Sequence, residues 1–566
     1  MPERGGLAAR VPFRGASRVG AGFLGIFALV GILLLAPAFR NPIAASGVPF
    51  DQSSACFTGS RPGDCALESG FGLPRVLSGG RGRSFLPYTD PGGSPRPEED
   101  FVLVPQGEIG AIPSGFWGAN LNFYTSPGYA NPRLAALVNA TPIRFLRLPL
   151  FGTYVVNQTV TNWTQVAEFC YWISCESEMT IGGPGYNASA VEGALRGLLD
   201  GVRFHPTYLV YGNEPNLWPS TTGYDYALDV ENFTAEVRSL DPGARVLGAE
   251  ITGHPGYGTS VIENVTRLDG QNISGFGLQI YPQIDATPTL AHFMAALQSN
   301  RSVTAEIADV RAEIRATCPG CDLPLFIDEF NGGSDPAYAP ERAGEPDVPF
   351  IAASVIQAWQ ANVSRFLIWT LAADTNYKCD FGLVELQGAC LANSPVNPSY
   401  YLYSQIFSYF AQGTLYNLSL PASQGLYGVV NVEGGNLTFL LVNANVTSPA
   451  TVTLGPGVPS GRCVTEELID PLDSGPAYSG QFPGPNGSAR PTVSVAWPAL
   501  SVEALRFPSS PGPCPPAPPS TGVDLLPVLG IGAAAGGILA AVWWRSSSRR
   551  PPAGRVRPRT RGVSSR

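Results

Sequence analysis

The stretch Tyr208-Leu-Val-Tyr-Gly-Asn-Glu-Pro-Asn-Leu-Trp218 decides the fold. Its apolar beginning predicts a buried strand that delivers Asn213, Glu214 and Pro215 at its carboxyl end. In a barrel of parallel strands, the carboxyl ends are where catalytic side chains gather. Glu214 is therefore a candidate catalytic group, although a lone glutamate at a strand end is more often a solvated loop residue.

A second stretch supplies a partner for Glu214. Pro324-Leu-Phe-Ile-Asp-Glu-Phe-Asn331 is another apolar strand ending in a carboxylate, Glu329, three strands further along the chain. Cleavage of a glycosidic bond with retention of configuration needs two carboxyl groups about 5 Å apart. One attacks the anomeric carbon and the other protonates the leaving oxygen. Glutamates at the ends of the fourth and seventh strands of one barrel can converge to that separation.

Short apolar segments alternate with helical patterns between residues 115 and 371, which is typical of repeated βα units. Strands are expected at 115–124, 143–149, 178–183, 206–213, 245–251, 274–281, 324–330 and 365–371. Helices are expected at 191–199, 224–240, 303–315 and 348–361, where apolar residues recur three and four apart. The sequence therefore predicts an α/β fold, a (β/α)8 TIM barrel over residues 112–410.

The pattern changes to short alternating strands after a helix near residues 400–410. Runs at 426–432, 436–443, 450–454, 462–469 and 492–507 predict a C-terminal β-sandwich over 411–508. Residues 41–111 are rich in Gly, Pro and Ser and predict an irregular segment, with order beginning near Phe101. The Pro-rich residues 509–524 predict a stiff stalk.

Both ends of the chain combine an apolar run with arginines. Within the basic segment 1–40, residues 19–39 are long enough to cross a bilayer, as a signal anchor or as a long signal peptide. A transmembrane helix is expected at 525–544, followed by an Arg-rich tail at 545–566. The positive-inside rule places this tail in the cytoplasm and the chain between the two runs outside the cell membrane.

Cysteine and asparagine usage agrees with an exported middle segment. The ten cysteines fall as close couples, which predict disulfides. A redox or zinc role for Cys318-Pro-Gly-Cys321 is the weaker alternative, because no second CxxC accompanies it. Thirteen Asn-x-Ser/Thr sequons favour an N-glycosylated exterior. The excess of acidic residues, 44 against 35 basic, opposes polyanionic ligands on average. The couples are Cys56 with Cys65, Cys170 with Cys175, Cys318 with Cys321, Cys379 with Cys390, and Cys463 with Cys514.

The motifs Gly212-Asn-Glu-Pro-Asn216 and Ile327-Asp-Glu-Phe-Asn331 resemble the acid/base and nucleophile motifs of clan A retaining glycoside hydrolases. Within the clan, the chain resembles most the heparanase and β-glucuronidase family, and next the β-xylosidase and α-iduronidase family. The resemblance covers about residues 112–508. It implies Glu214 as acid/base, Glu329 as nucleophile and Asn213 as donor to the sugar 2-hydroxyl.

The same resemblance implies three further substrate-site residues. Tyr281 matches a tyrosine that hydrogen-bonds the nucleophile, Trp369 a platform under the sugar, and Arg147 an arginine near the nucleophile. Gln279 departs from the pattern, since many relatives carry histidine there, and Asp328 has no assigned role. The alternatives are that Tyr281 and Trp369 are core aromatics and that Arg147 is a structural ion-pair partner. Other aromatics, including Trp117 and Trp218, either stack on sugars or plug the barrel mouth.

The leading hypothesis is a membrane-anchored, outward-facing retaining glycosidase that acts on a polysaccharide or surface glycan. One alternative is a catalytically silent surface glycoprotein that only binds glycan. Another is a transglycosylase that remodels the cell coat with the same two carboxylates. The three histidines are too scattered for a metal site, and no cofactor or nucleic-acid partner is implied.

Overall fold

The molecule is represented by a computed structural model of the chain, in which residues 101–509 are described with internal gaps. The gaps fall at 104, 122–131, 149–159, 253–256, 282–293, 333–346, 374–381, 386–395, 446–447, 455–462, 470–477, 484–492 and 498. The expected apolar runs at 19–39 and 525–544, the stalk and the couples that involve Cys56, Cys65, Cys379, Cys390 and Cys514 lie outside the described residues. Among the helices that are described, none is long and apolar enough to cross a membrane.

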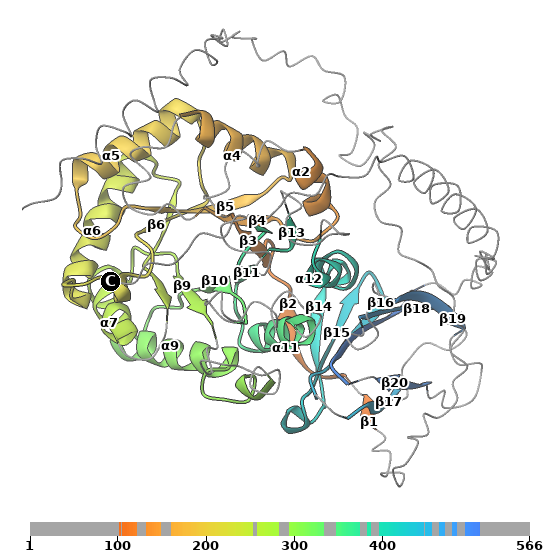
Figure 1. Cartoon of the computed structure of the whole chain (residues 1–566). Helices are drawn as coiled ribbons and strands as arrows, with labels where there is room; N and C mark the ends of the chain where they lie inside the picture. The colour runs from red at the N-terminus through yellow and green to blue at the C-terminus, as the bar shows by residue number, and fades with distance from the viewer. Residues whose placement is uncertain are drawn as a thin grey trace, which may run out of the picture. The chain divides into compact units, whose positions relative to one another are not determined.

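A parallel sheet forms the centre of the part of the chain between residues 117 and 368 (Figure 1). Its strands are β3 (Trp117–Asn120), β4 (Phe145–Leu148), β5 (Glu176–Ile181), β6 (Tyr208–Tyr211), β7 (Arg245–Leu247), β8 (Glu250–Thr252), β9 (Phe276–Ile280), β10 (Leu325–Phe330) and β11 (Arg365–Ile368). They follow the order β7-β6-β5-β4-β3-β11-β10-β9-β8. Every predicted barrel strand therefore has a counterpart in the sheet.

The two ends of this order are halves of one strand. Only Gly248 and Ala249 separate β7 from β8 in the chain, and β7 pairs with β6 while β8 pairs with β9. Counting β7 and β8 as one, the nine segments make an eight-stranded barrel that closes on itself. The predicted TIM barrel is confirmed.

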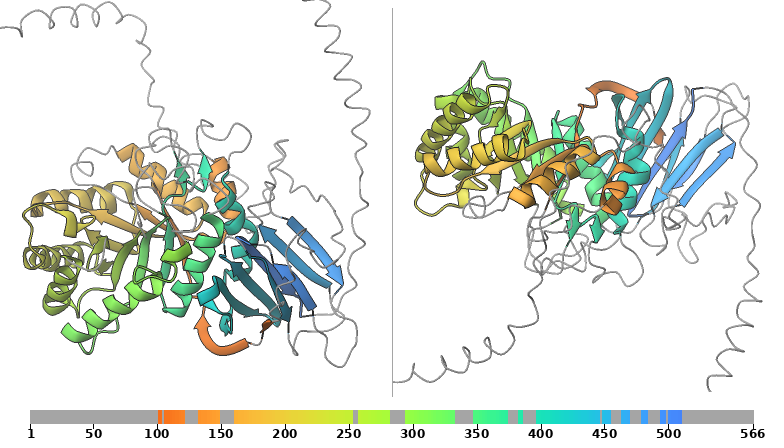
Figure 2. Two further views of the ribbon diagram at one scale, coloured as in Figure 1. Left: turned by 60° about the horizontal axis from the view of Figure 1, so that its bottom comes forward. Right: turned by 90° about the horizontal axis from the view of Figure 1, so that it is seen from above.

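Helices lie outside the strands (Figure 2). They are α2 (Pro132–Asn139), α4 (Val160–Trp172), α5 (Ala188–Arg196), α6 (Gly223–Leu240), α7 (Tyr257–Asp269), α9 (Val303–Thr317) and α11 (Asp347–Gln360). Their starts follow local chemistry, because α6 begins with a capping box between Thr222 and Asp225 and the Ser302 side chain caps α9. The four predicted helices match α5, α6, α9 and α11.

Helix α11 joins the barrel to the C-terminal sheets. All of its residues from Asp347 to Trp359 are buried, as expected for a helix that is apolar on every side. It packs on α9 and also on β15 (Leu426–Glu433) and β21 (Ser501–Phe507). A short helical segment, α12 (Pro398–Tyr401) with η7 (Leu402–Ile406) and η8 (Phe407–Phe410), corresponds to the helix expected near 400–410. The largest apolar core therefore extends from the barrel onto one face of the larger C-terminal sheet, and a second core lies within the sandwich.

The predicted β-sandwich consists of two sheets, in which every strand pair is antiparallel except the pair of β1 with β17. The larger has the order β19 (Tyr478–Pro483), β18 (Cys463–Ile469), β21, β16 (Asn436–Asn443), β15, β14 (Thr414–Leu418), β2 (Pro105–Ala111). The smaller has the order β1 (Phe101–Leu103), β17 (Ala450–Leu454), β20 (Val493–Trp497). Between β15 and β16, Gly434 and Gly435 have φ of +56° and +81°, which a two-residue hairpin requires.

One boundary differs from the prediction. The first described strand begins at Phe101, where order was expected to begin, but residues 101–111 do not belong to the irregular segment to which they were assigned: they form β1 and β2 and pair with β17 and β14 of the sandwich. The sequence of β2, Pro-Gln-Gly-Glu-Ile-Gly-Ala, has no apolar alternation because β2 is an exposed edge strand. Edge strands tolerate proline and need no second buried face.

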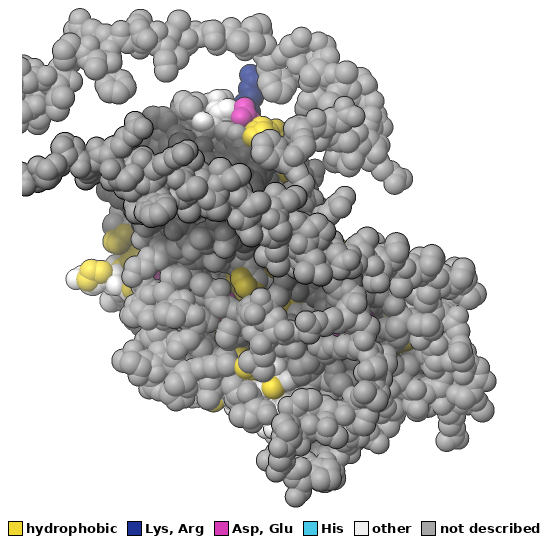
Figure 3. All heavy atoms as spheres, turned by 45° about the vertical axis from the view of Figure 1, so that its right-hand side comes forward, with side chains coloured by type: hydrophobic (Ala, Val, Ile, Leu, Met, Phe, Trp, Pro, Cys, Tyr) yellow, Lys and Arg dark blue, Asp and Glu magenta, His cyan; other side chains and the backbone are white. Residues whose placement is uncertain are grey.

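On the face drawn in Figure 3, hydrophobic side chains of described residues form small separate groups, and a basic and an acidic side chain lie side by side near the top. The described large hydrophobic side chains that are exposed are Tyr171, Leu217 and Tyr224. Leu217 lies three positions after Glu214 in the chain.

Candidate active site

The predicted site residues lie at the carboxyl ends of the barrel strands. Arg147 is in β4, Asn213 and Glu214 follow β6, and Tyr281 directly follows β9. Glu329 is the penultimate residue of β10. Hydrogen bonds join all five of these residues into one group, described below.

Arg147 is fully buried and uses all five of its guanidinium N–H groups. Nε and Nη2 donate to the two carboxylate oxygens of Glu250, at 2.8 and 2.6 Å. Nη2 also donates to Asn213 Oδ1 at 2.6 Å. Nη1 donates to Asn120 Oδ1 at 2.8 Å and to Glu329 Oε1. Arg147 therefore forms buried ion pairs and also lies beside Glu329, so the two interpretations of this residue do not exclude each other.

Asn213 is oriented by two donors. Its Oδ1 accepts from Arg147 at 2.6 Å and from Gln279 Nε2 at 2.7 Å, so its Nδ2 must point the other way. There Nδ2 lies 3.2 Å from Glu214 Oε2. Gln279, the departure from the relatives' histidine, thus keeps a hydrogen-bonding role at this position. The arrangement leaves an amide N–H facing the acid/base candidate.

The turn that carries Glu214 is held in an unusual backbone conformation. Glu214 has φ of +48° and ψ of +54°, a left-handed conformation that costs a non-glycine residue about 1 kcal/mol or more. Gly212 at φ +68° packs directly on the Trp218 ring, whose Nε1 donates to Asn213 O at 2.9 Å. Asn216 anchors the turn to β8 by exchanging two hydrogen bonds with the Thr252 backbone.

Glu329 is held by two donors of different kinds. Tyr281 Oη donates to Glu329 Oε2 at 2.6 Å, and Arg147 donates to Oε1. Burial raises the pKa of Glu329, while Arg147 and Tyr281 act in the opposite direction by favouring the carboxylate. Both oxygens of Glu329 therefore accept bonds that only the ionised form uses fully.

Glu214 has a different environment. Burial raises its pKa to about 7, and the negative charge of Glu329 adds to this, while Arg147 opposes it. In the part of the chain that is described, no cation lies within salt-bridge distance of Glu214. The two carboxyls therefore differ: both oxygens of Glu329 accept hydrogen bonds that favour its anion, whereas Glu214, with a pKa of about 7, is partly protonated near neutral pH.

Asp328 acquires a structural role that its sequence position did not reveal. The pairing of β10 with β9 shifts register between Ile327 and Glu329, which is a β-bulge. The Asp328 carboxyl lies over Gly277 of β9, and its Oδ1 accepts the Leu278 backbone N–H at 3.1 Å. A side chain thereby replaces a strand hydrogen bond next to the nucleophile candidate.

Trp369 directly follows β11 and is half-buried. Its backbone N–H donates to Phe330 O at 2.9 Å, and its carbonyl accepts from Asn331 Nδ2 at 2.6 Å. These bonds place Trp369 next to the strand end that carries Glu329. Its role as a sugar platform stays a prediction.

Two other aromatic candidates are also placed by the structure. Trp117 is buried, donates from Nε1 to Phe410 O at 2.8 Å and stacks on Phe407, so it belongs to the core between barrel and sandwich. Trp218 packs under the turn that carries Glu214, as described above. Neither position favours sugar stacking, because Trp117 is a core residue outside the barrel and Trp218 supports a turn at the barrel mouth.

The residues that sequence reasoning missed are the partners of Arg147. Asn120 ends β3 and donates to Asp328 O at 2.7 Å, and Glu250 begins β8. Thr180 of β5 donates to both oxygens of Glu250, at 2.9 and 3.2 Å. Each of these residues is polar and lies within an apolar predicted strand. A buried polar side chain normally has a hydrogen-bond partner, so such residues could have been proposed as members of the site.

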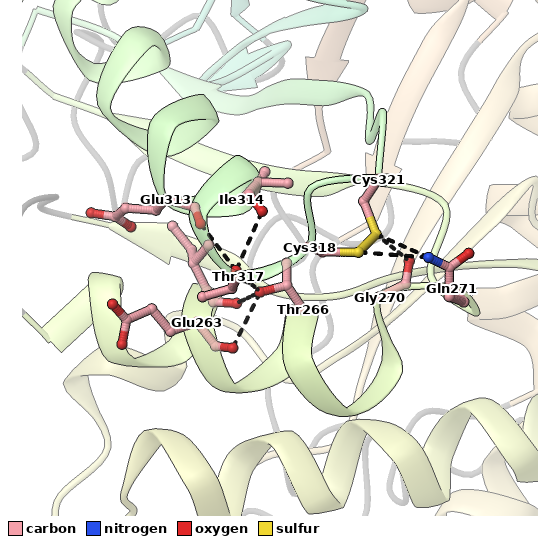
Figure 4. Close-up of a disulfide and its surroundings, with 10 residues drawn as sticks. Glu263, Thr266, Gly270, Gln271, Glu313, Ile314, Thr317, Cys318 and Cys321 are labelled. Carbon is pink, nitrogen blue, oxygen red and sulfur yellow. Dashed lines mark hydrogen bonds between the residues drawn. A yellow bond between two sulfur atoms is a disulfide. The ribbon is translucent and has the colours of Figure 1, made fainter.

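The Cys318-Pro-Gly-Cys321 motif forms a disulfide, as does Cys170 with Cys175, and both predicted pairings are confirmed. In Figure 4, Gln271 points at the Cys318–Cys321 sulfurs, with Nε2 at 3.6 and 3.5 Å. Cys318 ends α9, at the negative end of the helix dipole, whereas redox-active thiolates favour helix N-termini. The bridge also precedes β10, at the opposite end of the barrel from Glu329.

The chain is similar to known proteins in its structure, but not detectably in its sequence. No protein-family model and no curated protein matches the chain. Solved glycoside hydrolases match it over most of its length. The α-L-arabinofuranosidase from Thermotoga maritima has a TM-score of 0.57 at 13% identity, covering 72% of this chain and 99% of that chain.

Two further structures extend the likeness. The GH51 arabinofuranosidase from Xanthomonas axonopodis pv. citri has a TM-score of 0.54 at 15% identity, covering 72% and 99% of the two chains. The monomeric β-xylosidase from Caulobacter crescentus has a TM-score of 0.53 at 13% identity, covering 71% and 98%. The chain therefore has the fold of these glycoside hydrolases, in agreement with the clan A resemblance. The nearer likeness to the heparanase family stays a prediction.

The contact between Gly277 and Asp328 predicts a steric test. A Cβ at Gly277 would lie 1.7 Å from Asp328 Oδ2, so Gly277→Ala should displace Asp328 and destabilise the fold by about 1–3 kcal/mol. Gly193→Ala in α5 is the matched control, because its Cβ meets nothing within 4 Å and should be neutral or stabilise by up to about 1 kcal/mol. Urea unfolding midpoints measure both. Equal midpoints for the two variants would contradict the packing described here.

Proposed function

We propose that the chain is a retaining glycosidase in which Glu329 is the nucleophile and Glu214 the general acid/base. The observation that carries the proposal is the Arg147 guanidinium, which bonds Glu329 and, through Asn213, reaches Glu214. Two carboxyls at the ends of the fourth and seventh strands are thereby held in unlike environments. Opposite protonation states in one site are what a double displacement requires.

In the first step, the Glu329 carboxylate attacks the anomeric carbon and the bond from that carbon to the leaving oxygen breaks. Glu214 transfers its proton to the leaving oxygen. Tyr281 and Arg147 keep Glu329 ionised and aligned before the attack. The Asn213 amide, oriented by Arg147 and Gln279, is placed to donate to a hydroxyl of the bound sugar.

In the second step, Glu214 is the base. Its carboxylate takes a proton from a water molecule, the water oxygen bonds to the anomeric carbon, and the ester bond to Glu329 breaks. Two inversions give overall retention. A pKa of about 7 suits this exchange of roles, because Glu214 then gives and takes a proton with similar ease near neutral pH.

We further propose that this domain acts outside the cell while tethered to the membrane. The support is the pair of apolar runs with basic flanks, the sequons and the two disulfides, since disulfides persist in oxidising compartments. The acidic composition favours a neutral glycan over a polyanionic one as substrate. Screening the full chain with aryl glycosides identifies the sugar.

The two environments predict a bell-shaped dependence of kcat/KM on pH. Activity should fall as pH rises through about 7, because Glu214 loses the proton that it must donate. It should also fall at low pH as Glu329 takes up a proton. In Glu329→Gln the negative charge that raises the pKa of Glu214 is gone, so NMR titration of labelled Glu214 should show a lower pKa than in the wild type. An unchanged pKa would show that the two groups do not interact.

The roles of the two glutamates predict unlike defects. Glu329→Ala should abolish turnover of an aryl glycoside, because nothing else occupies the anomeric face. Glu214→Ala should still react with an activated aryl leaving group, which needs little protonation, and then stall until azide replaces water. The glycosyl azide should keep the substrate's anomeric configuration, as read by NMR. An inverted azide product, or full activity in either variant, would reject the assignment.

Membrane topology has its own test. Protease added to intact cells should digest the segment between residues 41 and 522 and leave an epitope on the Arg-rich tail protected. Permeabilised cells are the control, in which the tail should also be cleaved. A tail that is lost from intact cells would place the C-terminus outside and overturn the proposed orientation.

A further inference from the structure

Three more carboxyl groups lie next to the nucleophile. Glu178 of β5, Glu250 of β8 and Asp328 of β10 are all buried and offer oxygens within 4.8 Å of one another. With Glu329 they place four carboxyls around the Arg147 guanidinium. No other Arg or Lys of the described chain makes an ion pair with any of the four. Four anions around one cation in a barrel interior would be strongly repulsive.

Glu250 has the contacts of an anion. Its two oxygens accept from Arg147 at 2.8 and 2.6 Å in a bidentate pair, and the Thr180 hydroxyl adds contacts of 2.9 and 3.2 Å. Since Arg147 has no other N–H free, this pair fixes the plane of the guanidinium. The same plane decides where the remaining N–H groups meet Glu329 and Asn213.

Glu178 has the contacts of a neutral acid. Neither of its oxygens has a hydrogen-bond donor, and the nearest cation atom is Arg147 Nε at 3.5 Å from Oε1. Burying a carboxylate without donors is far more costly than burying a carboxylic acid that gives its proton to a neighbour. Asp328 Oδ2 likewise has no donor of its own. Glu250 and Asp328 are therefore the acceptors available for the Glu178 proton.

Electrostatics agree with this reading. Burial raises the pKa of Glu178 well above its usual value, and the charges of Asp328 and Glu250 raise it further, against Arg147. Burial also raises the pKa of Asp328, the charges of Glu250 and Glu329 add to this rise, and Arg147 opposes it. Two further titratable groups of the described chain interact with Glu250. Burial raises the pKa of Tyr226 of α6 well above its usual value, and the charge of Glu250 adds to the rise in the pKa of Glu214.

We propose that Glu250 positions the nucleophile through Arg147, and that Glu178 is held as a neutral carboxylic acid so that Glu250 remains ionised against the guanidinium. The first half rests on the proposed glycosidase function, and the second does not. A divalent cation on the same oxygens would lie against the Arg147 guanidinium, so the geometry favours a proton. The metal reading is an outcome of the test below.

Kinetics of the full chain test Glu250. Glu250→Gln breaks the bidentate pair, so kcat should fall roughly 100-fold with little change in KM. Removing this negative charge also lets Arg147 act more strongly on Glu329, whose pKa Glu250 raises, so the acid limb of the pH profile should move to lower pH. Glu250→Asp should recover part of kcat. Glu192→Gln, in an exposed pair with Arg196, is the control that should change neither quantity.

Infrared difference spectroscopy tests Glu178 without any need for turnover. The wild type minus Glu178→Gln spectrum at pH 7 should contain the carbonyl band of a protonated carboxyl, and Glu178→Gln should lose less than about 10-fold in kcat because an amide keeps the shape and neutrality. A carboxylate band instead, or a loss equal to that of Glu250→Gln, would overturn the neutral assignment. Tight Mn²⁺ binding by the wild type that Glu178→Gln abolishes would also overturn it.

The arms separate the two proposals. If the wild type hydrolyses no glycoside, the proposed glycosidase function is wrong. The infrared measurement still tests whether Glu178 is neutral, because it does not depend on turnover. Infrared titration of Glu329 then replaces kinetics for Glu250, and its midpoint should lie lower in Glu250→Gln than in the wild type. An unmoved midpoint and an unmoved acid limb would both reject the role of Glu250.

Discussion

The fully buried guanidinium of Arg147 is the interaction on which the site depends. Removing a cation from water is costly, and the cost is offset only when the geometry is good and all donors are used. Here five N–H groups meet oxygens from four other strands or strand ends, on Asn120, Asn213, Glu250 and Glu329. A shift of any of these strands breaks a bond to Arg147. The barrel geometry and the alignment of the two candidate catalytic glutamates are therefore maintained together.

Irregular backbone conformations place the two candidate glutamates where regular strands would not. A strand alternates side chains between its two faces, so Asp328 and Glu329 could not both approach the interior without the bulge in β10. Gly277 leaves the space that the Asp328 carboxyl fills. The left-handed conformation at Glu214 is a similar local cost at a functional turn, sustained by Trp218 and Asn216. A bulge thus presents Glu329, and a left-handed residue at a turn presents Glu214.

Much of this architecture is readable in the sequence. Apolar strands and helical spacing predicted the barrel, and two strand ends with matching motifs predicted the pair Glu214 and Glu329. The partners of Arg147 were not predictable, because Glu250 and Asn120 acquire meaning only when β8 and β3 lie beside β4 in space. The edge strand β2 was not predicted because it is exposed and contains Pro105 and Gly107, so its sequence has no apolar alternation. Glu178 shows a third limit, as its protonation depends on charges contributed by other strands.

The central claim is that Glu329 forms the covalent bond to the sugar. The most direct measurement is to treat the full chain with activated 2-deoxy-2-fluoro glycosides, which slow the second step, and to map the labelled residue by peptide mass spectrometry. One sugar per chain is expected, attached to the peptide that contains Glu329, and no label is expected in Glu329→Ala. A label on Glu214 or on any other side chain would contradict the account.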